Sequence, residues 1–370
     1  MGLKKLASSE SKARSESRRP THQRSVRSGA DKSAAETTMP DESGKVSAIR
    51  NENTSSAEKE KLPTRTAAKK EAKLVVDGHT VTITNPEKIY WPDEKITKGD
   101  LIHYYNTIAS YILPYQKDRP QSLRRNPNGI RDKGFFHKDA GHDTPEWVDT
   151  IELEAESANR KIQYILCNNK ATLLYLNNLG CIELNPWNSR ISKPDYPDYM
   201  VIDLDPSENN SFDQVIDSAK VVKEVLDEAG AVAYCKTSGA TGLHIYVPLK
   251  AQYSYEDVRG FSERVAQITE QRLPKTTTTE RSLSKRGGRI YLDYLQNKKG
   301  QTLASVYSAR PKPGATVSTP LLWKEVKHGL HPSQFNIFNI EKRLNKTGDL
   351  FTGVLKEKIN LKKCMKNLGG

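Results

Sequence analysis

The most informative part of the chain is the run Tyr199-Met200-Val201-Ile202-Asp203-Leu204-Asp205-Pro206. Apolar residues followed by a proline are typical of a buried strand that ends at this point. Strand residues two apart point to the same side, so Asp203 and Asp205 project together. Two carboxylates this close repel each other unless a cation lies between them, and Mg²⁺ or Mn²⁺ prefers oxygen ligands. Taken alone, the pair also fits two solvated turn acids, with Asp205 capping the next helix.

Strands and helices are predicted on both sides of this run. The predicted strands are 200–204, 231–236, 243–248 and 289–295, and the predicted helices are 97–113, 212–229 and 255–273. Apolar residues recur at helical spacing in each helix, and Thr97 is a plausible N-cap with Asp100 three residues later. Two further strands flank the Asp77-Gly78 turn within 74–84. Strands mixed with helices indicate an α/β or α+β domain.

Composition divides the 370 residues, of net charge +13, into two populations. Residues 1–72 contain no Phe, Trp or Tyr, so we predict a disordered basic tail or linker there and order from about Lys73.

No run of 18 apolar residues and no signal-peptide core occurs, which excludes the membrane classes. The four cysteines form no CxxC pair, so a zinc site or disulfide framework is not expected and a reducing cytosol is the default. The basic excess suggests a polyanionic partner.

A third aspartate stands in the predicted strand 289–295. Asp293 lies among apolar and aromatic residues, where an unpaired carboxylate is costly. It therefore needs a cation or a hydrogen-bonding partner. A strand Asp-x-Asp with a distant strand Asp is the layout of a two-metal phosphoryl-transfer site.

Two more segments carry candidate binding groups. The loop Ser238-Gly239-Ala240-Thr241-Gly242 precedes a strand that begins near His244, and it can present N–H groups to a phosphate or serve as a plain turn. In Gly134-Phe135-Phe136-His137-Lys138, adjacent aromatics follow several arginines, which suits base stacking and phosphate contact. The alternative is that one of the two phenylalanines faces the core. The nearby arginines are Arg119, Arg124, Arg125 and Arg131.

Taken in chain order, these segments resemble the polymerase domain of bacterial ligase D, a member of the archaeo-eukaryotic primase superfamily. The matching pieces are 85–88, Thr97-Lys98, 134–138, Pro145-Glu146-Trp147, 182–187, 203–206, 238–244, 292–295 and 307–310. The resemblance implies an α/β primase-polymerase fold, in which an RRM-like catalytic sheet of antiparallel or mixed strands packs beside an N-terminal α/β subdomain. On this basis we expect the polymerase domain at 73–350 and a basic C-terminal tail at 351–370.

The resemblance also implies a role for individual residues. Asp203, Asp205 and Asp293 match the family's metal-binding, catalytic carboxylates. The residues that match nucleotide contacts are Ser238, His244, Arg286 and Arg310. Lys88 and Lys98 match the pair that binds a 5′-phosphate on DNA, and Phe135 and Phe136 match aromatics that stack on bases. Three positions depart from the family pattern, each with the loss of a cation near the nucleotide: Asn185, Thr241 and Gln296.

The expected function is template-directed, two-metal nucleotidyl transfer to DNA 3′-ends at breaks or gaps in non-homologous end joining, with ribonucleotides and Mn²⁺ preferred over dNTPs and Mg²⁺. The resemblance also implies Ku and a DNA ligase as partners, and a cytoplasmic location at the bacterial nucleoid. Two alternatives stay open. One is a 5′-phosphate end-binding module whose synthesis is weak or lost, which the three departures favour. The other is a primase that starts strands de novo.

Overall fold

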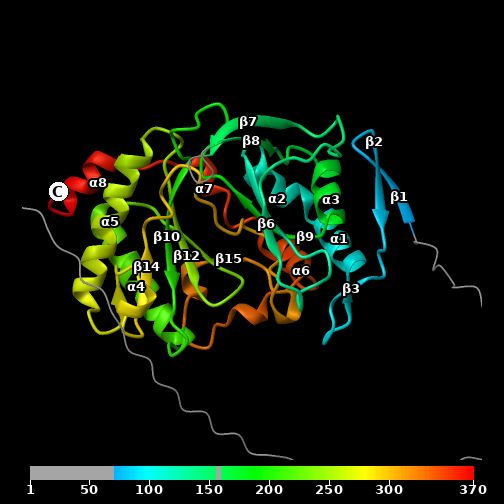
Figure 1. The fold of residues 1–370 in the computed structure, drawn as a ribbon. Coiled ribbons are helices and arrows are strands. Elements are labelled where there is room, and N and C mark those ends of the chain that lie inside the picture. The colour runs from blue at the N-terminus through cyan, green and yellow to red at the C-terminus, as the bar shows by residue number, and fades with distance from the viewer. Residues whose placement is uncertain (1–70, 156–159) are drawn as a thin grey trace, which may run out of the picture. The chain divides into compact units, whose positions relative to one another are not determined.

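The computed structural model describes residues 71–155 and 160–370 (Figure 1). The predicted tail at 1–72 lies outside the described residues except for its last two, which begin strand β1 (Glu71–Val76). This strand pairs with β2 (His79–Thr84) across the predicted turn at Asp77 and Gly78.

The largest sheet has six strands in the order β13-β14-β10-β12-β11-β15. Its strands are β10 (Tyr199–Asp205), β11 (Tyr234–Thr237), β12 (Leu243–Pro248), β13 (Thr277–Thr278), β14 (Ile290–Asp293) and β15 (Pro320–Leu321). Along the chain, the central strands and two helices follow as β10-α4-β11-β12-α5-β14. The central strands pair antiparallel in the spatial order β14-β10-β12-β11, which is the split βαβ arrangement of RRM-like sheets. The predicted catalytic sheet is therefore confirmed.

Helices α4 (Phe212–Ala229) and α5 (Tyr255–Arg272) pack on one face of this sheet. Each begins with a capping box, and α4 ends at Gly230, whose φ of 75° is the left-handed conformation that glycine adopts without strain. Alternate β10 residues such as Met200 and Ile202 point into this apolar layer. The intervening residues, including the two aspartates, therefore face the other side of the sheet.

The second half of the fold lies on that other side (Figure 1). Its elements are α1 (Lys98–Thr107), α2 (Ala109–Gln116), α3 (Lys170–Asn178) and a three-stranded sheet of β6 (Phe135–His137), β5 (Gln121–Arg125) and β9 (Cys181–Pro186). The two remaining strand pairs are β3 (Ile89–Trp91) with β4 (Ile96–Thr97) and β7 (Thr150–Ala155) with β8 (Arg160–Ile165).

The single helix predicted at 97–113 is instead two helices that meet at Ile108 (φ −95°, ψ 10°). The predicted cap at its start, Thr97 with Asp100, is confirmed.

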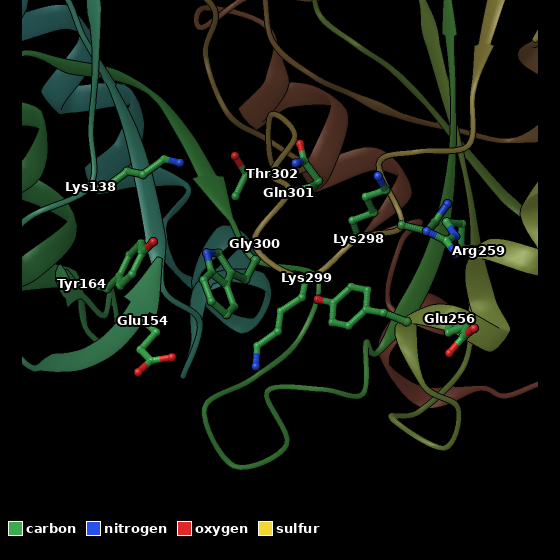
Figure 2. Close-up of a pocket in the computed structure, with 13 residues that line it drawn as sticks. Lys138, Glu154, Tyr164, Glu256, Arg259, Lys298, Lys299, Gly300, Gln301 and Thr302 are labelled. Atoms are coloured by element: carbon green, nitrogen blue, oxygen red, sulfur yellow. The ribbon is translucent and has the colours of Figure 1, made fainter. Parts of the chain in front are cut away.

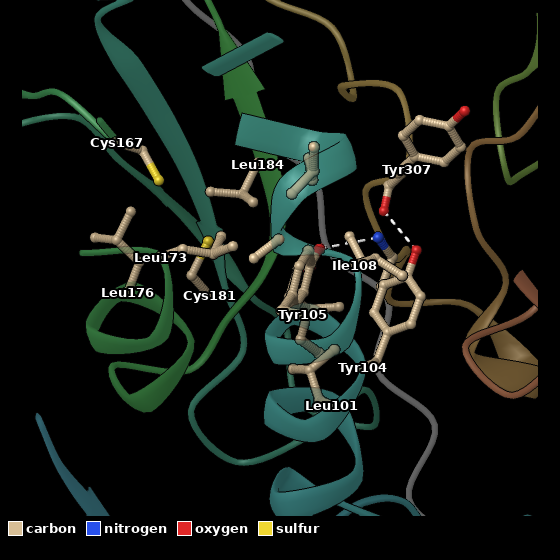
Figure 3. Packing of buried hydrophobic residues seen from close by; sticks show 14 of the residues in the cluster. Leu101, Tyr104, Tyr105, Ile108, Cys167, Leu173, Leu176, Cys181, Leu184 and Tyr307 are labelled. Carbon is tan, nitrogen blue, oxygen red and sulfur yellow. Dashed lines mark hydrogen bonds between the residues drawn. The ribbon is translucent and has the colours of Figure 1, made fainter. Parts of the chain in front are cut away.

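Buried tyrosines join helix α1 to strand β9 and to the segment 307–309 (Figure 3). The Tyr104 hydroxyl donates to the carbonyl of Tyr307 at 2.7 Å. The Tyr105 hydroxyl donates to the carbonyl of Ile182 at 2.7 Å and accepts from the N–H of Ala309 at 2.9 Å. The segment that carries Arg310 is thereby fixed against α1.

Residues 351–370 do not form the basic tail expected from their composition. Phe351 is buried, and the helices α7 (Gly353–Lys356) and α8 (Leu361–Asn367) follow it. Leu361, Cys364 and Leu368 pack into the layer of α4 and α5, while the lysines between them remain on the surface. The segment folds because its apolar residues, although few, recur at helical spacing. Among the described helices, none combines the length and apolar character needed to cross a bilayer.

Candidate active site

Strand register brings the predicted carboxylates together. Asp203 lies directly opposite Asp293 of β14 on one side and His244 of β12 on the other. Directly opposite residues on antiparallel strands have Cβ atoms about 5 Å apart, so these three side chains share one patch of the sheet. Asp205, two residues on, faces the same side near the end of β10.

The three carboxylates differ in their surroundings. Burial, with Asp293 and Asp205 nearby, raises the pKa of Asp203 to about 7. Burial also raises the pKa of Asp293, although Gln296 Nε2 donates to it at 2.8 Å and the N–H of Leu295 at 2.9 Å. Asp205 is half-exposed and pairs with Arg286 Nη1 at 3.0 Å. The patch therefore holds more negative charge than its protein partners offset.

As they are oriented in this structure, the three carboxylates fit a hard divalent cation only in part. Within the described residues, no three His, Cys, Asp or Glu side chains converge as the ligands of a metal ion. Asp205 is turned to Arg286, and Asp293 is turned to its own loop. All three groups are nevertheless oxygen donors on adjacent strands, and Mg²⁺ is commonly held by one or two carboxylates completed by substrate phosphates. Burial and the neighbouring carboxylates disfavour the ionised form of Asp203 and so raise its pKa. A bound cation would stabilise that ionised form.

The loop after β11 is folded tightly around the Ser238 hydroxyl. Ser238 Oγ accepts from the N–H of Ala240 at 3.1 Å and from that of Gly242 at 3.0 Å. A Cβ at Gly242 would lie 2.1 Å from the Leu204 carbonyl oxygen, so only glycine allows β12 to begin this close to β10. The loop therefore closes the cavity beside Asp203 and leaves fewer N–H groups free for a phosphate than its glycines suggest.

Buried Lys236 contacts the ring nitrogen of His244 that does not face Asp203. Lys236 lies opposite His244 on β11, and its Nζ is 2.8 Å from His244 Nδ1 and 2.6 Å from Ser318 Oγ. His244 Nε2 is 3.3 Å from Asp203 Oδ1. Burial, with Lys236 and Arg310 nearby, lowers the pKa of His244 well below its ordinary value, so a neutral ring makes this contact. Sequence reasoning missed Lys236, because a lysine beside a loop reads as a solvated residue.

Arg310 completes the wall opposite the carboxylates. Its Nε lies 2.8 Å from Glu183 Oε2, and its Nη1 donates to the Ser238 carbonyl. Glu183 is a second contact residue for which the sequence predicted no individual role. A cavity of about 240 Å³ lies among these groups; its lining includes Phe136, Glu183, Asn185, Asp203, Ser238 and Arg310. Asn185 is buried there, and its Nδ2 has no hydrogen-bond partner among the described residues.

The predicted DNA-binding residues lie on the second half of the fold, apart from the six-stranded sheet. Phe135 and Phe136 are 46% and 58% exposed, so neither faces the core. The guanidiniums of Arg125 and Arg124 lie 5.4 Å and 5.1 Å from the centres of these rings. Arg119, by contrast, is fully buried and paired with Asp198, so it is not part of a basic surface.

The two lysines predicted to bind a 5′-phosphate are close to each other but unequally exposed. Lys98 is buried, and its Nζ donates to the Thr84 carbonyl at 2.6 Å and to Asn178 Oδ1 at 2.7 Å. Lys88 Nζ reaches Asn128 Oδ1 at 2.7 Å. Burial, with Lys88 nearby, lowers the pKa of Lys98 to about 8. At pH 7, below this pKa, the Lys98 ammonium still carries its charge.

Comparison with known proteins agrees with this geometry. A family model described as "LigD, primase-polymerase domain" matches residues 97–351. The chain belongs to the LigD primase-polymerase family. The solved polymerase domain of Mycobacterium tuberculosis Ligase D, in complex with DNA, superposes with a TM-score of 0.70 at 28% identity, over 75% of this chain and 99% of that one. The predicted family and the mixed α/β fold class are confirmed.

Curated LigD proteins extend well beyond this chain. The bifunctional non-homologous end joining protein LigD of Bacillus subtilis is 34% identical over 267 residues, which are 72% of this chain and 42% of that protein. The multifunctional LigD of Mycolicibacterium smegmatis is 30% identical over 273 residues, 73% of this chain and 35% of that protein. The chain thus spans less than half the length of these relatives.

The three departures from the LigD pattern have different surroundings. Gln296 donates to Asp293, so a neutral amide stands beside this carboxylate. Asn185 is buried in the cavity wall, whereas Thr241 lies exposed at its rim. Each position contributes hydrogen-bonding atoms rather than positive charge. Among the described residues that line the cavity, Arg310 is the one Lys or Arg, and Arg286 lies nearby through its ion pair with Asp205.

Proposed function

We propose that this chain is a template-directed nucleotidyltransferase that adds nucleotides, ribonucleotides in preference, to DNA 3′-ends at breaks and gaps. The observation that carries the proposal is the placement of Asp203 between Asp293 and His244 on three adjacent strands, beside a cavity that Asp203, His244 and Arg310 line. Related LigD proteins are named for non-homologous end joining, and we assign this chain to that process at nucleoid DNA, with Ku and a ligase as partners.

Asp203, Asp205 and Asp293 would hold two divalent ions, Mn²⁺ or Mg²⁺. When bound, such ions activate a 3′-hydroxyl and offset the charge that develops on the leaving pyrophosphate. Arg286 and Gln296 now occupy Asp205 and Asp293, so these side chains must yield part of their contacts to the ions. Arg286, freed from Asp205, becomes available to the triphosphate.

The remaining cavity residues bind and orient the triphosphate. His244 is held by Lys236, and its neutral ring donates a hydrogen bond without adding a buried charge. Arg310 is oriented by Glu183 and by the Ser238 carbonyl, so its guanidinium is fixed before the substrate arrives. Donors and cations fixed in advance stabilise transition-state charge without reorganising during the reaction.

The exposed aromatics and the lysine pair would bind the DNA. Phe136 lines the cavity and would stack on the templating or incoming base, whereas Phe135, its neighbour on β6, points to the other face and would stack on a base outside the cavity. Lys88 and Lys98 would bind a 5′-phosphate across a gap, because a bound anion offsets the repulsion between them.

Extension of a gapped DNA that carries a 5′-phosphate tests the proposal. The assay compares NTPs with dNTPs and Mn²⁺ with Mg²⁺. Asp203→Ala and Asp205→Ala should each abolish extension, whereas Asp217→Ala, an exposed residue of α4 outside the cavity, should extend like the parent. Extension by both cavity variants at the parental rate would refute the two-metal proposal.

A second candidate is an end-binding module with marginal synthesis. The neutral amide of Gln296 beside Asp293 favours it, since this side chain brings no positive charge that could hold an incoming triphosphate. This candidate predicts tight binding of 5′-phosphorylated ends that depends on Lys88, with no nucleotide incorporated under any metal. Incorporation by the purified protein would exclude it.

A further inference from the structure

A groove separate from the cavity opens along the loop that follows β14. It has a volume of about 870 Å³, and the loop from Asn297 to Thr302 forms its floor. Figure 2 shows Lys138 and Tyr164 on one side of this loop and Glu256 with Arg259 on the other. None of these residues has a role in the site described above.

The groove is predominantly basic. Its lining contains four cations, Lys138, Arg259, Lys298 and Lys299, against two carboxylates, Glu154 and Glu256. Lys299 is paired with Asp195 at 2.6 Å. The other three cations make no ion pair within the described residues. Unpaired cations along a groove attract a polyanion, and the charge excess is local to this surface.

The floor of the groove is anchored to the catalytic strand. The buried Asn297 side chain accepts from the N–H of Val201 at 2.8 Å and donates to the Val201 carbonyl at 2.7 Å, two residues before Asp203. At the other end, Thr302 bridges to Trp187, the residue that ends the 182–187 motif. Both ends of the loop are thus fixed, and Lys298 holds a defined position relative to the carboxylates.

The groove borders the active-site cavity. Thr302 lines both of them. Lys298 lies five positions after Asp293 in the chain, so their Cα atoms lie within about 18 Å, at most about 3.6 Å per residue. A stacked strand rises about 3.4 Å per nucleotide, so Lys298 is within reach of roughly the first five phosphates behind a 3′-end at Asp293.

We propose that this groove binds the sugar-phosphate backbone of the nucleic-acid strand whose 3′-end enters the cavity, with Lys298, Lys138 and Arg259 as its phosphate contacts. The inference rests on the proposed function, because it takes the strand end at the carboxylates as given. It is distinct from the 5′-phosphate site at Lys88 and Lys98. Because Tyr164, Trp187 and Tyr255 of the lining are buried, the groove offers no stacking platform, and binding is independent of base sequence.

Charge reversal in the groove tests the proposal. Lys298→Glu and Lys138→Glu are compared with Lys327→Glu, an exposed lysine outside both the groove and the cavity. The readouts are the affinity for a primer-template duplex with an unphosphorylated 5′-end, its dependence on salt, and the KM for the primer. Each groove variant should lower the slope of log K against log[salt] by about 1 and raise the primer KM, whereas the control should match the parent. Thermal unfolding verifies that all variants are folded.

Primer length gives a second arm. Shortening the primer from ten nucleotides to two removes the phosphates that reach Lys298, so the KM penalty of Lys298→Glu should shrink as the primer shortens. An unchanged salt slope together with an unchanged primer KM in both groove variants would overturn the inference, even if the parent extends primers. If the parent extends nothing, the proposed function fails, and the binding arm still decides whether the groove holds DNA.

Discussion

Replacing Asp203 with Asn is expected to stabilise the metal-free protein while it abolishes nucleotide transfer. Burial, with Asp293 and Asp205 nearby, raises the pKa of Asp203 from 3.8 to about 7. The folded protein therefore binds this proton more tightly than the unfolded chain, and the ionised carboxylate lowers stability as pH rises from 3.8 to about 7. Asn keeps an oxygen for His244 Nε2 and carries no charge.

The size of the effect follows from the shift. About 3 pKa units correspond to roughly 4 kcal/mol once Asp203 is fully ionised, at about 1.4 kcal/mol per unit. Side-chain relaxation makes this a ceiling, so a gain on the order of 1–4 kcal/mol is expected at pH 8. At pH 5 only the unfolded chain has largely lost the proton, which leaves a gain of less than about 2 kcal/mol. The gain should therefore grow with pH and level off above 7.

Urea denaturation in the presence of a chelator measures this gain at pH 5 and pH 8. Asp205→Asn is the matched control, because Asp205 is half-exposed and its replacement breaks an ion pair with Arg286. Adding Mn²⁺ should then close the gap between parent and Asp203→Asn, since the cation stabilises the parent by binding its folded state. Equal stabilities at pH 8, or a gain that does not vary with pH, would show that burial and the neighbouring carboxylates do not destabilise ionised Asp203 in the folded protein.

Three further outcomes are expected. Gly242→Ala places a methyl group 2.1 Å from the Leu204 carbonyl oxygen, so the unfolding free energy should fall by about 1–3 kcal/mol or more, as read from urea midpoints. Tyr105→Phe leaves the buried N–H of Ala309 without its acceptor, which should cost about 1–3 kcal/mol in the same assay. Phe136→Ala should leave the unfolding midpoint nearly unchanged, because the ring is exposed, yet weaken template binding by about 1–3 kcal/mol in a fluorescence titration.

The parts of the fold that could be read from the sequence are those where one local pattern determines the structure. Helix α4 ends at its predicted residue because apolar periodicity, a capping box and a left-handed glycine all agree. Strand β10 could also be predicted locally, because its run of apolar residues ends at Pro206. Ile108 shows the opposite case, since its apolar spacing continues through the point where the chain turns from α1 into α2.

Other features depend on contacts that no local pattern reports. Residues 351–370 look like a tail because lysines outnumber the few apolar residues that hold them to α4 and α5. Lys236 reads as a surface residue until His244 is placed beside it by strand pairing. Arg119 reads as part of a basic surface until Asp198 is brought against it by tertiary packing. In each case the partner is distant in sequence, so composition assigns the residue to solvent.

The charge in the cavity follows from the rigidity of the sheet. Asp203 cannot move away from Asp293, because β10 is hydrogen-bonded on both sides and its apolar side chains are locked beneath α4 and α5. The close approach at Gly242 prevents β12 from shifting to make room. Repulsion that a loop would relieve by moving is therefore retained in the folded protein. A cation that enters this patch removes a cost already present, so the same strand pairing that strains the metal-free protein favours metal binding.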